Sequence, residues 1–154
     1  MSETAMPPKR MASPFADWRA HHVAFRAPDY LAARDWYVEV LDFRVIAEWD
    51  YGDIRLAFLA PPGDDEFYIE LFGDGSPAPV EARPWTDLND SLKYRGFHHV
   101  CFSVANVDGT VARLAARGAK IVLEPVDIPA IERRIAFFAD PFGNLVELAG
   151  PLPA

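Results

Sequence analysis

The strongest constraint on this chain is that its sequence repeats itself at a fixed distance. The segment HHVAF at residues 21–25 recurs 77 positions later as HHVCF at residues 98–102. The segment FYIEL at residues 67–71 resembles NLVEL at residues 144–148, again 77 positions apart. A duplicated module explains this better than chance, because the polar residues repeat together with the apolar ones. The chain is therefore expected to contain two similar modules, at residues 19–73 and 96–150.

Each module predicts a strand, a helix and three further strands. Asp29 and Asn106 are suitable N-caps for helices at residues 30–41 and 107–117, and Gly118 is a suitable stop for the second helix. Hydrophobic alternation and turn residues then predict the strands. In order, they are residues 21–26, 44–49, 54–59 and 66–72 in the first module, and 98–104, 120–123, 133–139 and 145–148 in the second.

The residues outside the two modules are expected to form an N-terminal tail and a linker. Residues 1–17 are rich in proline and lack the apolar stretch of a secretory signal, which favours a flexible tail. Residues 74–95 contain glycine and several prolines and are expected to link the modules, with a short helix near residues 86–94. Trp85 and Tyr94 in this linker are candidates to cover a pocket. Residues 18–154 are thus expected to form a single domain.

Composition narrows the class of protein. Apolar residues make up 51% and aromatic residues 13% of the chain, which is typical of a globular domain. The net charge of −8 argues against nucleic acid and against an anionic membrane surface as partners. No apolar run is long enough to span a bilayer. Cys101 is the only cysteine, so no disulfide forms within the chain, and a cytoplasmic location is expected.

Strand alternation places one histidine and one glutamate on the same face of each module, opposite an apolar face. These residues are His22 and Glu70 in the first module and His99 and Glu147 in the second. A single strand histidine or glutamate is more often structural than functional, but these four occupy equivalent positions of the repeat. If the two half-sheets curl toward each other, the four side chains converge. Two imidazoles and two carboxylates suit one divalent ion such as Zn, Ni, Co, Mn or Fe(II).

The neighbouring polar residues are weaker candidates. His21 and His98 alternate onto the apolar side, which favours packing or support of the adjacent histidine over metal binding. Arg26 and Cys101 share a face with the four candidate ligands and are expected to line a pocket. The arginines at positions 55, 133 and 134 are more simply explained by surface salt bridges.

These residues resemble a known family. The segment HHVAF, Asp29 and the segment RDWYVEVLDF at residues 34–43 are similar to the opening module of the vicinal oxygen chelate superfamily. The segment DPFGNLVEL at residues 140–148 resembles its closing strand, which carries a glutamate ligand. The resemblance extends from Trp18 to Pro151, with Asp42 standing where the family usually has glycine. It implies an α+β fold of two paired βαβββ modules that form an incomplete barrel around one metal, held here by His22, Glu70, His99 and Glu147.

The resemblance also implies an activity. Glyoxalase I and methylmalonyl-CoA epimerase place a metal ligand at the position of Glu70, whereas the dioxygenases and fosfomycin-resistance enzymes normally do not. The implied protein is a lyase or isomerase that binds vicinal oxygens of a small substrate on the metal. It moves a proton through an enediolate or enolate, with Glu70 or Glu147 as the catalytic base. No asparagine follows Glu70 closely, unlike in glyoxalase I, and no convincing coenzyme A cluster is present, so the sequence leaves the substrate open.

Two alternatives remain at the level of sequence. One is an Fe(II) extradiol-type dioxygenase of the same fold, for which His22, His99 and Glu147 would suffice. The other is a metal-free protein that binds a drug or metabolite. The resemblance further implies a homodimer, in which the site is built within one chain or shared between two.

Overall fold

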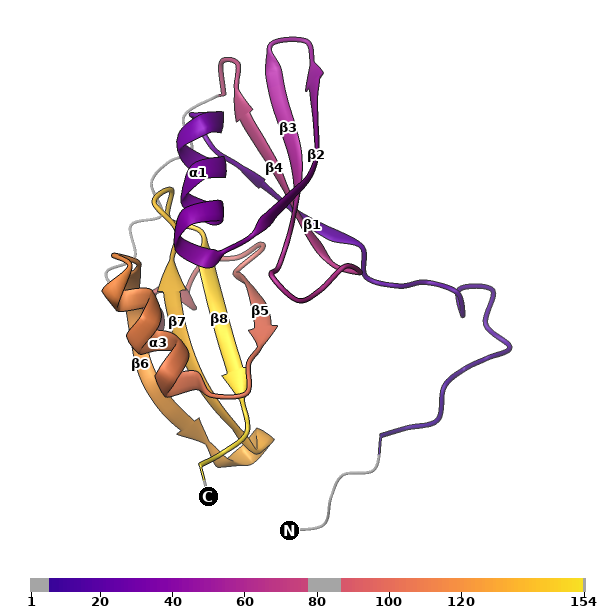
Figure 1. Ribbon diagram of the computed structural model, residues 1–154. Coiled ribbons are helices and arrows are strands. Elements are labelled where there is room, and N and C mark those ends of the chain that lie inside the picture. The colour runs from indigo at the N-terminus through magenta and orange to yellow at the C-terminus, as the bar shows by residue number, and fades with distance from the viewer. Residues whose placement is uncertain (1–5, 78–86, 154) are drawn as a thin grey trace.

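The computed structural model describes residues 6–77 and 87–153 of the 154-residue chain (Figure 1). The first module contains β1 (His22–Arg26), α1 (Tyr30–Leu41), β2 (Arg44–Tyr51), β3 (Ile54–Ala60) and β4 (Tyr68–Asp74). A short helix, α2 (Leu88–Ser91), precedes the second module. That module contains β5 (His99–Ser103), α3 (Val107–Ala116), β6 (Lys120–Ile128), a 3₁₀ turn (Pro129–Ile131), β7 (Arg133–Ala139) and β8 (Leu145–Gly150).

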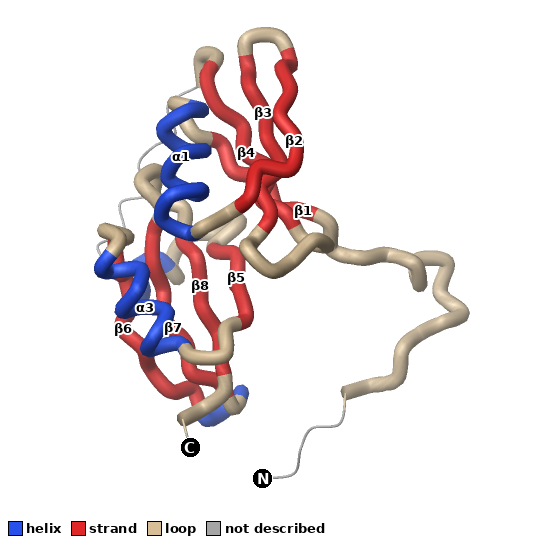
Figure 2. The backbone as a smooth tube through the Cα atoms, in the orientation of Figure 1, coloured by secondary structure: helices blue, strands red, loops and turns tan. Residues whose placement is uncertain are grey.

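The two modules form sheets of the same topology. The strand orders are β1-β4-β3-β2 and β5-β8-β7-β6, and in each sheet the first and last strands of the module pair in parallel at one edge. This confirms the α+β fold of two βαβββ modules. Within one chain, however, the sheets are separate open units and do not close into a barrel (Figure 2).

Both main helices begin where their capping residues predict. The Asp29 carboxylate accepts a hydrogen bond from the Ala32 N–H at 2.9 Å, and the Asn106 amide oxygen accepts one from the Gly109 N–H at 2.9 Å. Helix α1 ends at Leu41 and is followed by Asp42, which adopts the left-handed conformation with φ of 56°. Aspartate tolerates this conformation better than most residues, and its carboxylate pairs with Arg117 at 2.6 Å. This contact anchors the turn at which the sequence departs from the usual glycine.

The larger of two hydrophobic clusters among the described residues joins the modules. It combines Phe25, Ile69 and Leu71 of the first sheet with Val146 and Leu148 of the second. Tyr37 of α1, which is 1% exposed, donates a hydrogen bond from its hydroxyl to Asp140 at 3.0 Å. The modules therefore pack through the faces that carry the apolar side chains. Because strand side chains alternate, the candidate metal ligands lie on the opposite face of each sheet.

The connecting segments match the predictions in part. Helix α2 lies within the predicted range of residues 86–94 but spans only Leu88–Ser91. Trp85 lies outside the described residues. Residues 6–19 lead away from the body of the molecule as a series of turns (Figure 1). No helix among the described residues is long and apolar enough to cross a membrane.

Candidate metal site

The first candidate pair lies on the two parallel strands at one edge of the first sheet. Strands β1 and β4 run parallel, with Ala24 opposite Glu70, so His22 lies two residues away on the same face. The Nε2 atom of His22 is 3.2 Å from Oε2 of Glu70. The His22 side chain is 37% exposed and that of Glu70 is 14% exposed, so the pair remains open to an incoming group.

The second pair reproduces this geometry in the second sheet. Strand β5 pairs in parallel with β8, with Cys101 opposite Glu147. The Nε2 atom of His99 lies 2.9 Å from Oε2 of Glu147, and the two side chains are 32% and 16% exposed. The repeat in the sequence thus produces the same pair of candidate ligands twice.

The two pairs do not meet within one chain. In the described ranges, no group of three or more histidine, cysteine, aspartate or glutamate side chains is positioned to share an ion. The common core explains this separation, because the modules associate through their apolar faces and leave the two histidine–glutamate faces apart. A single chain therefore presents two half-sites.

Each candidate ligand histidine is supported by the histidine that precedes it. The Nδ1 atoms of His21 and His22 are 2.8 Å apart, and those of His98 and His99 are 2.7 Å apart. In such a contact one nitrogen donates and the other accepts, so the contact links the tautomers of the two rings. It leaves Nε2 of His22 and His99 directed toward glutamate, which is how a supporting partner orients a metal-ligating histidine. His98 is itself held by the Ser91 hydroxyl, 2.8 Å from its Nε2 atom.

Cys101 is part of the second half-site without being a nucleophile. Burial, followed by the neighbouring charge of Glu147 and a hydrogen bond to it, raises the pKa of Cys101 to about 12. The thiol is therefore protonated at neutral pH and donates to the Glu147 carboxylate. Cys101 and His99 both lie on β5, so Glu147 is held by two side chains of the neighbouring strand.

Aromatic rings border both half-sites, a feature that the candidate ligand set did not include. Phe58 stands opposite Glu70 in the register, and its ring is 5.5 Å from His22 and 4.9 Å from Trp49. Phe137 stands opposite Glu147, and its ring is 5.1 Å from that of His99. The signal was present in the sequence, because Ala-Phe at residues 57–58 recurs at residues 136–137. These rings limit the access of water to the carboxylates.

The arginines considered from the sequence are engaged elsewhere. Arg26 donates to the backbone carbonyls of Ala27 and Asp74, and does not line the half-site as a free cation. Arg55 pairs with Asp74 at 2.8 Å. Arg134 pairs with Asp108 and Asp127, each at 2.6 Å. The salt bridges expected for Arg55 and Arg134 are thus confirmed.

Comparison with known proteins places this geometry in a family. Residues 19–148 match the model of the Glyoxalase/Bleomycin resistance protein/Dioxygenase superfamily. Over 138 residues the chain is 30% identical to the uncharacterized protein YaeR of Escherichia coli, covering 84% of this chain and 94% of YaeR. It is also 30% identical over 144 residues to a lactoylglutathione lyase of Pseudomonas aeruginosa, covering 83% and 80% of the two chains.

A solved structure supports the same assignment. The crystal structure of SMU.1112c superposes with a TM-score of 0.71 at 27% identity, covering 86% of this chain and 98% of that one. The match extends over both modules. The chain therefore belongs to the Glyoxalase/Bleomycin resistance protein/Dioxygenase superfamily, as the resemblance of its two modules predicted.

Proposed function

We propose that this protein is a metal-dependent lyase or isomerase that binds a small substrate through two neighbouring oxygens and moves a proton on it. The observation that carries the proposal is the pair of equivalent histidine–glutamate contacts, one in each module. The similarity to a lactoylglutathione lyase supports the same class of reaction. The single cysteine favours a cytoplasmic location for this enzyme.

The donor atoms fit a divalent ion. Nitrogen and oxygen ligands lie about 2.0–2.2 Å from such an ion, so two neighbouring ligand atoms are about 3 Å apart. The Nε2–Oε2 distances of 3.2 Å and 2.9 Å match this spacing. Two carboxylates balance the charge of the ion, and mixed nitrogen and oxygen ligands suit Zn, Ni, Co, Mn or Fe(II). We assign His22, Glu70, His99 and Glu147 as its ligands.

We infer that the four ligands come together from two copies of the chain. The first module of one copy would face the second module of the other, and a two-fold dimer would contain two such sites. The exposed aromatic surface around the first half-site supports this arrangement, since Tyr51 on the same sheet is 76% exposed and Trp49 and Phe58 are only partly buried. A partner module would cover this surface and complete the site.

A divalent ion bound there would polarise the two substrate oxygens and stabilise the negative charge that develops on them. Glu70 is the better placed of the two glutamates to carry the proton. Glu147 is held by both His99 and the Cys101 thiol, whereas His22 is the only polar side-chain partner of Glu70 in the described part of the chain. Phe58 stands opposite Glu70 on the neighbouring strand, beside the carboxylate that would move the proton.

Metal analysis tests the ligand assignment. The purified protein, loaded with divalent metal and then desalted, is expected to hold about one ion per chain, and His99→Ala to hold almost none. His98→Ala removes the supporting ring but no ligand, so metal affinity is expected to fall about 10- to 100-fold without disappearing. Full metal content in His99→Ala would refute the assignment. Absence of metal from the wild-type protein would favour a metal-free binding protein, and iron with substrate-dependent oxygen uptake would favour a dioxygenase.

A further inference from the structure

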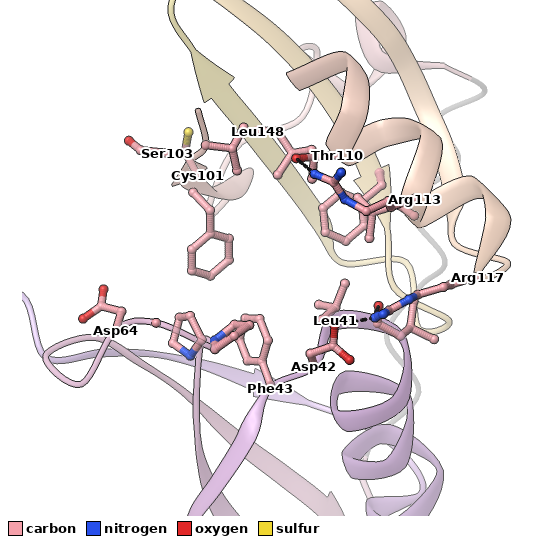
Figure 3. Close-up of a pocket in the computed structure, with 18 of the residues that line it drawn as sticks. Leu41, Asp42, Phe43, Asp64, Cys101, Ser103, Thr110, Arg113, Arg117 and Leu148 are labelled. Carbon is pink, nitrogen blue, oxygen red and sulfur yellow. Dashed lines mark hydrogen bonds and ion pairs between the residues drawn. The ribbon is translucent and has the colours of Figure 1, made fainter. Parts of the chain in front are cut away.

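A cavity lies between the two modules. This intermodule cleft has a volume of about 730 Å³ and is bounded by the C-terminal end of α1, the loop at residues 61–64, β5 and α3 (Figure 3). None of the four proposed ligands lines it. Its volume is within the range of sites that enclose small organic molecules.

The walls of the cleft are mainly apolar. The ring of Phe102 stands 5.8 Å from that of Phe43 and 6.1 Å from that of Phe67, so aromatic rings from both modules meet at the cleft. Leu114 of α3 and Leu148 of β8 add aliphatic surface. A hydrocarbon or aryl group would lose its contact with water here, which is the main favourable contribution to binding an apolar ligand.

The cleft also carries one cation that has no carboxylate partner within residues 6–77 and 87–153. Two guanidinium groups line it, and that of Arg117 is neutralised by Asp42 at 2.6 Å. Arg113, in contrast, contacts only the Thr110 hydroxyl at 3.4 Å among the residues described. Asp64 lines the opposite side of the cleft (Figure 3). One free guanidinium favours a single negative charge, and the carboxylates of Asp42 and Asp64 disfavour a multiply charged anion such as phosphate.

Strand β5 provides further polar groups at the mouth of the cleft. It is the edge strand of its sheet and pairs only with β8. The N–H of Val104 donates to the carbonyl of Ala149 in β8. Successive peptide groups of a strand point to alternate sides, so those of Cys101 and Ser103 point away from β8, toward the free edge. Both residues line the cleft. The cleft thus offers a ligand the free backbone groups of β5 in addition to the guanidinium of Arg113 and the apolar walls.

We propose that the intermodule cleft binds a hydrophobic monocarboxylate, such as a medium-chain fatty acid. The carboxylate would pair with the guanidinium of Arg113, whose planar fork matches it in two parallel hydrogen bonds. The hydrocarbon chain would lie among Phe43, Phe102 and Leu114. This site uses none of the proposed metal ligands, so it stands or falls separately from the proposed enzymatic function.

Calorimetric titration of the full chain with decanoate, in the presence of EDTA, tests the proposal. One saturable site per chain is expected, and Arg113→Gln is expected to raise Kd about tenfold or more, because a charge-assisted hydrogen bond is lost. Arg113 is exposed, so the substitution leaves the fold intact. Arg133→Gln is the matched control, because it removes the same charge from an exposed position outside the cleft, and its Kd should equal that of the wild type.

Titration with decanol shows how much of the affinity depends on the negative charge, because decanol has a neutral hydroxyl in place of the carboxylate. The wild-type protein should bind decanol about tenfold or more weakly than decanoate, and Arg113→Gln should bind the two ligands with similar affinity. The proposal is overturned if decanoate shows no saturable binding, or if Arg113→Gln binds it as well as the wild type does. Equal loss of affinity in Arg133→Gln would also overturn it, since the effect would then come from net charge alone.

Discussion

Replacing Glu70 by glutamine is expected to lower kcat about 100- to 10,000-fold while leaving metal bound, because the amide oxygen still coordinates but no longer accepts a proton. The side chain is 14% exposed and pairs with His22, so an amide of the same size fits the same space. Steady-state kinetics and metal analysis should be carried out on the same preparation. A suitable substrate panel contains the glutathione hemithioacetal of methylglyoxal and a methylmalonyl thioester.

Glu147→Gln is the matched control for this experiment. It changes the equivalent ligand, but one that the Cys101 thiol and His99 both hold, so its kcat is expected to fall less than that of Glu70→Gln. Full activity of Glu70→Gln with metal bound would show that Glu70 does not carry the proton. A larger fall in kcat for Glu147→Gln than for Glu70→Gln would mean that Glu147, and not Glu70, moves the proton.

Asp140→Ala is expected to reduce the free energy of unfolding by about 3–4 kcal/mol. Asp140 is 4% exposed, and its carboxylate accepts hydrogen bonds from the Tyr37 hydroxyl, the Phe142 N–H and both the backbone and side-chain N–H groups of Asn144. Burial, the charge of Asp140 and their hydrogen bond hold the pKa of Tyr37 well above its usual value, so the hydroxyl remains a donor. Alanine would leave these buried donors without an acceptor.

Chemical denaturation at one fixed protein concentration measures this loss. Tyr37→Phe is the control, because it removes one donor and leaves the other three bonds of Asp140, and about 1 kcal/mol of stability should be lost. A loss below about 1 kcal/mol in Asp140→Ala would mean that water or local rearrangement satisfies the buried groups. The account of Asp140 as the polar connection between the modules would then be wrong.

The sequence predicted the helices closely, because their ends depend on local capping. Helix α1 covers exactly the predicted residues, and α3 ends one residue earlier than expected. Strand ends depend on partners that a single sequence does not identify. Strand β4 extends to Asp74, whose carboxylate accepts the Tyr30 N–H and pairs with Arg55. Both partners are distant in sequence.

Strand β6 was predicted too short for a related reason. It continues past Pro125 to Ile128, although proline normally ends a strand. The strand lies at the edge of its sheet, and the register shifts between Leu123 and Val126, so the proline interrupts no regular ladder bond. Whether a strand is central or at an edge is a property of the assembled sheet.

The candidate site, like the strands, could be predicted from the sequence only in part. The repeat identified His22, Glu70, His99 and Glu147, and strand alternation placed each histidine on the same face as its glutamate. Which faces of the modules meet depends on packing, and it is the apolar faces that associate within the chain. The contact between Tyr37 and Asp140 spans 103 positions and had no local signal. The sequence therefore identified the half-sites but not their separation.

The proposed site shared between two chains is tested most directly by pairing two different inactive chains. Chains carrying His22→Ala and His99→Ala, each with its own affinity tag, would be co-expressed and the mixed dimer isolated by both tags. If the site is shared, one of its two sites combines both substitutions and the other is intact, so the mixed dimer should bind about one ion where the wild-type dimer binds about two. Each variant alone should bind almost none.

The reciprocal control pairs a wild-type chain with a chain that carries both substitutions. A shared site then loses one histidine in each of its two copies, so this mixed dimer should bind almost no metal. The contradictory result is the reverse pattern, with no ion in the dimer of the two single variants and about one ion in the dimer that contains a wild-type chain. That pattern would mean that the four ligands meet within one chain.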